Sequence, residues 1–133
     1  MKQITREWLT FARKDIASCE RLLGDDFLTN AVAFHAQQAV EKSFKAIIEE
    51  FEIGFIRTHD LIRLYTTVKG HLGFEIDVEM IKRLNEVYIE VRYPGELGLL
   101  PYGEPTVEEV GGFYEFARGV LEEVKLGLKQ RVD

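Results

Sequence analysis

Cysteine and long hydrophobic runs are both nearly absent from this sequence. The single cysteine, Cys19, has no partner for an internal disulfide and no companions for a thiolate metal site. No run of about 18 apolar residues occurs, and the first ten residues carry charges where a secretory signal would be apolar. These absences predict a cytoplasmic protein that does not span a membrane.

Basic residues are outnumbered, with 17 lysines and arginines against 23 aspartates and glutamates and a formal net charge of −6. Sequence-independent nucleic-acid binding relies on many basic contacts to phosphate. The balance therefore argues against strong binding of that kind, permits a local basic site, and favours protein partners over RNA. Residues 1–133 have the size of one domain, which we expect to fold without metal or disulfide.

Alternating strand patterns and tandem repeats are also missing, whereas helical spacing of apolar residues runs through most of the chain. Thr5, Thr58, Asp77 and Thr106 are expected to cap helices, the last in a capping box with Glu109. The five segments predicted to be helical are about residues 5–23, 30–51, 58–70, 77–93 and 106–133. This pattern predicts an all-α fold, an antiparallel up-and-down bundle of four to five helices.

The second predicted helix has an apolar stripe that includes Val40 and Phe44. Its opposite side carries a polar set: His35, Gln38, Lys42, Lys45 and Glu49. We interpret this polar set as a solvated outer face, with a subunit or ligand face as the alternative.

Proline is scarce and confined to one place, because all three prolines fall within residues 94–105. A loop of this length inside a small domain is usually functional or disordered, and its leucines predict packing on the bundle or on a second subunit. Arg92 and Tyr93 stand just before it, where Pro94 stops the fourth helix. Arg92 can complement the helix dipole or grip a phosphate, and Tyr93 can stack on a base or cover the loop.

Strong catalytic motifs are missing: the sequence has no phosphate-binding loop, no zinc-protease helix and no hydrolase nucleophile elbow. The three histidines lie in separate segments, and their spacing supports neither a metal site nor a cofactor site. In Thr58-His59-Asp60, helix capping accounts for the threonine and the aspartate but not for His59. A neutral histidine at a helix N-terminus could exchange a proton or hydrogen-bond with a substrate hydroxyl.

Three segments, in this order, resemble the HEPN domain, named for higher eukaryotes and prokaryotes nucleotide-binding. They are FHAQQAVEKSFKAI (Phe34–Ile47), THDLIRL (Thr58–Leu64) and YIEVRYPGE (Tyr88–Glu96). With WLTFARKDIASCERLL (Trp8–Leu23) and a terminal helix after GEPT, the similarity covers nearly the whole chain. The resemblance implies a helical bundle that forms a homodimer, often with a minimal nucleotidyltransferase as partner and sometimes as half of a toxin–antitoxin pair.

Many HEPN proteins are metal-independent ribonucleases with an arginine and a histidine separated by four to six residues. By resemblance, the arginine is Arg92, and the positions for the histidine are Leu97, Gly98 and Leu99. No histidine follows His71 in this chain. Losing a general acid or base costs a factor of about 10² to 10⁴ in rate, so the resemblance implies binding rather than catalysis.

We therefore expect a non-catalytic HEPN protein that binds a nucleotide or a partner minimal nucleotidyltransferase. Arg92 and Tyr93 would form the rim of the site, with contributions from His59, Lys42 and Lys45. Two alternatives stay open. One is a metal-independent ribonuclease using Arg92 and His59, and the other is a structural subunit that docks another chain through residues 95–105.

Overall fold

The computed structural model describes residues 1–54, 56–92 and 104–132, and the side chains of all of these except residues 89–92, 131 and 132. The described residues form helices and connections but no strand. The helices are α1 (Gln3–Leu22), α2 (Thr29–Glu50), α3 (Leu61–Val68), the short 3₁₀ helix η1 (Lys69–His71), α4 (Val78–Arg92) and α5 (Val107–Val132). The predicted all-α fold is confirmed.

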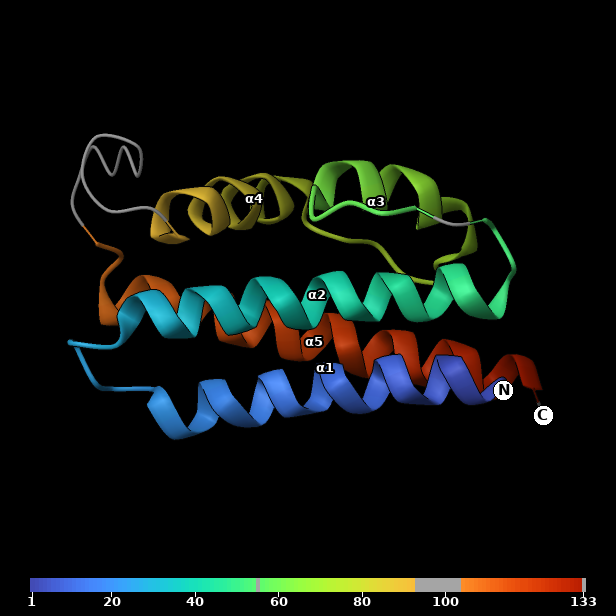
Figure 1. Ribbon diagram of the computed structural model, residues 1–133, viewed down its shortest axis with the longest axis horizontal. Helices are drawn as coiled ribbons and strands as arrows, with labels where there is room; N and C mark the ends of the chain where they lie inside the picture. Colours follow the sequence, from blue (N-terminus) through green and yellow to red (C-terminus); the bar gives the residue numbers. More distant parts are fainter. Residues whose placement is uncertain (55, 93–103, 133) are drawn as a thin grey trace.

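The helices form an up-and-down bundle in which α2 is the central element. α1, α2 and α5 lie along the long axis of the molecule, and α3 and α4 cover the other side of α2 (Figure 1). α1 and α4 run opposite to α2 and α5 (Figure 1). α2 packs against all four other α-helices, most extensively against α1 and α5.

The core is continuous from α1 to α5 and is built from the apolar stripes of all the α-helices. Phe44 of α2 and Phe113 of α5 are among its largest fully buried side chains, together with Leu61, Leu64 and Ile81. Burying one such side chain stabilises the fold by roughly 1.5–3 kcal/mol. This packing fixes the helices relative to one another, and with them the connecting segments that carry polar groups.

The expected solvated face of the second helix is not observed. No residue of α2 is fully exposed, and Gln37, Glu41 and Ser43 are buried. The polar side of this helix faces α1 and the start of α3, so its charged groups lie between helices. Its polarity serves contacts inside the molecule instead of contact with water.

Side chains cap three of the described helices, and two expectations about caps are wrong. Thr5 is not a cap, because α1 already begins at Gln3 and the Thr5 hydroxyl donates to Glu50 at 3.0 Å. Asp77 caps α4 by accepting from the backbone N–H groups of Glu79 and Met80, as predicted. Thr106 Oγ1 accepts from the N–H of Glu109 at 3.0 Å. Asp60, not Thr58, caps α3, because its carboxylate accepts from the N–H groups of residues 62 and 63. Thr58 Oγ1 accepts from the N–H of Asp60, just ahead of the helix.

None of the helices within the described ranges combines the length and apolar character that a membrane span needs.

Candidate ligand-binding face around His59

His59 is held in place where the chain enters α3. Its backbone carbonyl accepts a hydrogen bond from Gln37 Nε2 of α2 at 3.1 Å. Asn85 of α4 accepts from the N–H of Leu61 at 2.9 Å, and its side-chain amide also reaches Asp60. The start of α3 is thus tied to both α2 and α4, and the position of His59 is fixed from two sides.

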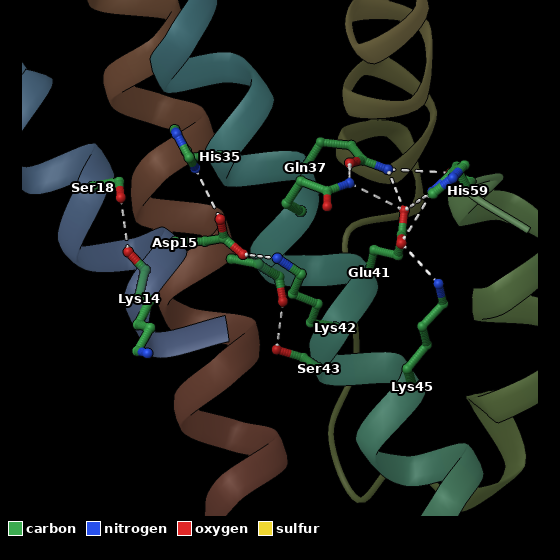
Figure 2. A network of polar contacts seen from close by, with 12 residues as sticks. Lys14, Asp15, Ser18, His35, Gln37, Glu41, Lys42, Ser43, Lys45 and His59 are labelled. Carbon is green, nitrogen blue, oxygen red and sulfur yellow. Dashed lines mark hydrogen bonds and ion pairs between the residues drawn. The ribbon is translucent and has the colours of Figure 1, made fainter. Parts of the chain in front are cut away.

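The His59 ring is oriented by a buried carboxylate. Its Nδ1 lies 3.0 and 3.1 Å from the two oxygens of Glu41 on α2, as Figure 2 shows. The Glu41 side chain is only 3% exposed, whereas that of His59 is 60% exposed. Because an ionised carboxylate only accepts hydrogen bonds, Nδ1 carries the hydrogen. In the neutral ring Nε2 is then an acceptor on the solvent-exposed part of the side chain.

Glu41 is satisfied by four donors, which is what a buried charge requires. Besides His59, Lys45 Nζ donates to it at 2.9 Å, and the amides of Gln37 and Gln38 donate at 3.3 Å each. The Lys45 ammonium also lies 5.4 Å from the centroid of the Trp8 ring. Lys45 therefore belongs to the His59 cluster, but as the counter-ion of Glu41.

Lys42 lies in a different cluster, on the α1 side of α2 (Figure 2). Its Nζ donates to Asp15 at 2.7 Å, and His35 Nδ1 lies 2.8 Å from the other oxygen of the same carboxylate. The Asp15 side chain is 8% exposed. The structure does not bring Lys42 together with His59, and this lysine neutralises a carboxylate at the seam between α1 and α2.

Aromatic rings connect His59 to the helix that ends at Arg92. The centroids of the His59 and Tyr88 rings are 5.8 Å apart, and Tyr88 stacks on Phe34 of α2 with centroids 5.8 Å apart. The backbone of Arg92, the last residue of α4, follows Tyr88 by four residues, about one helical turn. The three segments Phe34–Ile47, Thr58–Leu64 and Tyr88–Arg92 therefore meet at one place.

Tyr93 lies outside the described residues, as do residues 94–103 of the predicted docking loop. Of the five expected site residues, the structure joins His59 and Lys45 through Glu41. It places the backbone of Arg92 one turn of α4 beyond Tyr88, the residue that contacts His59. Sequence reasoning missed both Asp15 and Glu41 as buried charges. A signal was available for Asp15, since it lies beside Ile16 within the apolar stripe of the first helix.

Other reactive groups offer little chemistry in the described part of the chain. Burial raises the pKa of the Cys19 thiol from 9.0 to about 12, with Asp15 and Glu20 acting in the same direction. The thiol is therefore protonated at neutral pH and donates weakly to the carbonyl of Val32 at 3.6 Å. No group of three histidine, cysteine, aspartate or glutamate side chains that could hold a metal ion is found among these residues.

Comparison with known proteins places the chain in a family. The model of the HEPN domain matches residues 5–127. The crystal structure of TT1696 from Thermus thermophilus has a similar fold with a TM-score of 0.69 at 23% sequence identity, and the match covers 95% of this chain and 99% of that one. No curated protein matches. Since the family model extends from α1 through most of α5, the chain belongs to the HEPN domain family.

Proposed function

We propose that this HEPN protein binds a nucleotide at the face formed by His59, Tyr88 and the end of α4. The observation that supports it is the contact between the rings of His59 and Tyr88. Tyr88 lies one helical turn before Arg92, so this contact brings two of the sequence motifs together. Arginine grips phosphate oxygens with its planar fork, and a histidine edge can bond a ribose hydroxyl or a phosphate. Tyr88 is mostly buried and supports the His59 ring.

Titration calorimetry with ATP, GTP and a short single-stranded RNA tests this proposal. We expect one of these ligands to bind the wild-type chain, and His59→Ala and Arg92→Ala each to weaken binding by about tenfold or more, the loss expected of a charge-assisted hydrogen bond. His71→Ala and Arg118→Ala are matched controls, since both residues are exposed and lie outside this face. Wild-type affinity in both site variants would contradict the proposal.

A metal-independent ribonuclease is the second candidate, and one observation favours it. The Glu41 carboxylate fixes the tautomer of His59 and orients its exposed ring, the arrangement that a general base requires. RNA cleavage in EDTA that disappears in His59→Ala and persists in His71→Ala would support this activity. Equal background cleavage by both variants would exclude it.

We also propose a homodimer and a minimal nucleotidyltransferase partner of the toxin–antitoxin type, because these accompany the HEPN family resemblance. Exposed apolar surface on α1 supports association, since Ile4 and Phe11 are 41% and 50% exposed and stand seven residues apart on one face. Sedimentation at micromolar concentration should give the mass of a dimer. A monomer alone would contradict the homodimer.

A further inference from the structure

Three open hollows that share lining residues lie along α5, beside the segment that leads from η1 into α4, and together they are called the groove. Their volumes are about 510, 440 and 330 Å³. Asp77 lines both the first and the second, and Phe74 and Glu123 line both the second and the third. The lining runs from Thr106 to Gln130, a length of about 36 Å along a helix.

The floor of this groove is apolar, and glycines of α5 add no side chain that would fill it. Four partly buried apolar side chains pack against the core and border the hollows: Phe74, Ile76, Met80 and Phe116. Gly112, Gly119 and Gly127 of α5 also line it, and a Cβ added at any of them would meet nothing within 4 Å. A glycine inside a helix costs about 1 kcal/mol relative to alanine, and packing against the described residues does not require these three.

The groove also holds the charge imbalance of the protein. Its described lining includes two arginines and no lysine, and Arg83 and Arg118 pair with groove glutamates at 3.0 and 3.1 Å. It includes eight carboxylates: Glu75, Asp77, Glu79, Glu108, Glu109, Glu115, Glu122 and Glu123. Eight against two gives −6, which equals the formal net charge of the chain, so the other 15 acidic residues and the other 15 lysines and arginines cancel.

We propose that this groove docks a basic amphipathic segment of a partner protein. The lysines and arginines of that segment pair with the carboxylates of the rim, and its apolar side chains enter the floor. Glu122 and Glu123 are exposed, and neither forms a salt bridge with another described residue, although the charge of Glu122 also acts on Arg118. A phosphate-bearing ligand is repelled here, which separates the groove from the face around His59.

Fluorescence anisotropy with a labelled probe tests the docking. The probe is a helical peptide of about 18 leucines and lysines with one apolar face, and its counterpart carries glutamate in place of lysine. We expect the lysine peptide, and not the glutamate peptide, to bind the full chain at about 0.15 M salt. The Glu122→Lys/Glu123→Lys variant should bind the lysine peptide at least tenfold more weakly.

The Glu7→Lys/Asp26→Lys variant is the matched control, since it changes the net charge equally at exposed positions outside the groove. Unchanged binding by this control supports the groove, and an equal loss in both variants overturns the proposal. Absence of peptide binding by the wild type also overturns it. If the groove variant alters the sedimentation mass of the protein without peptide, the groove joins copies of this chain, and the proposal of a basic partner falls. Circular dichroism confirms that both variants are folded.

Discussion

Asp15 and Glu41 are each almost fully buried, and each accepts hydrogen bonds from one lysine and one histidine. Asp15 joins α1 to the middle of α2 through His35 and Lys42, and Glu41 joins α2 to the start of α3 through His59. Removing one partner of a buried ion pair leaves the other charge without compensation. A substitution at either carboxylate is therefore expected to lower the stability of the fold, and at Glu41 also to disturb the geometry of the candidate site.

Glu41→Gln should destabilise the protein by about 3 kcal/mol, because Lys45 loses a buried counter-ion. Glu115→Gln is the matched control, since Glu115 pairs with Arg118 in an exposed salt bridge. We expect that variant to stay within about 0.5 kcal/mol of the wild type. Urea denaturation measures both, and similar losses in the two variants would contradict this assignment.

The stability of the protein should fall in alkaline solution, partly because of Cys19. Its pKa rises from 9.0 to about 12 on folding, so the folded state keeps the proton longer than the unfolded state. The contribution of Cys19 to the free energy of unfolding is complete below pH 9 and is lost as the pH rises toward 12. The urea midpoint of the wild type should therefore drop more steeply above pH 9 than that of Cys19→Ala.

Tyr114 is a second group whose pKa is raised by folding, so it also makes the protein less stable in alkaline solution. Its hydroxyl donates to Glu20 at 2.6 Å, and this hydrogen bond raises the pKa of Tyr114 from 10.0 to about 12. Tyr114→Phe should accordingly remove part of the decline between pH 10 and 12. Parallel curves for the wild type and for both variants would contradict the two assignments.

At the scale of the helices, the spacing of apolar residues was sufficient to predict where each one lies, because a helix buries residues three and four apart. The caps were harder, since Thr58 and Asp60 both suit an N-terminus. Which of the two residues caps α3 depends on where the helix starts, and contacts from Gln37 and Asn85 determine that start. Contacts from other helices cannot be read from the local sequence.

Asp60→Ala should destabilise the protein by about 1 kcal/mol, the usual effect of losing an N-cap. Thr58→Ala is the control, since Thr58 makes a single local bond just before the helix. We expect it to cost less than half as much. Thermal denaturation of the two variants provides the measurement, and a larger effect at Thr58 would reverse the assignment of the cap.

For the molecule as a whole, the fold class was predictable and the candidate site only partly so. The helical pattern and the order of the motifs were enough to predict an all-α HEPN bundle. The contact between His59 and Tyr88 joins residues that are distant in sequence, and packing around α2 sets it. The central place of α2 was not predictable, because a helix with this many charged residues resembles a surface helix until its partners are known.

That central place has a consequence for the order of folding events. A helix that contacts every other helix is the natural nucleus, because the others gain their interactions only once it is present. Val40→Ala in α2 should therefore slow refolding, whereas Leu128→Ala near the end of α5 should mainly speed unfolding. Stopped-flow chevron plots separate the two effects, and identical refolding rates would contradict a nucleus on α2. With such a nucleus, the carboxylates of Asp15 and Glu41 would meet their cations early, before water is fully expelled from the interior.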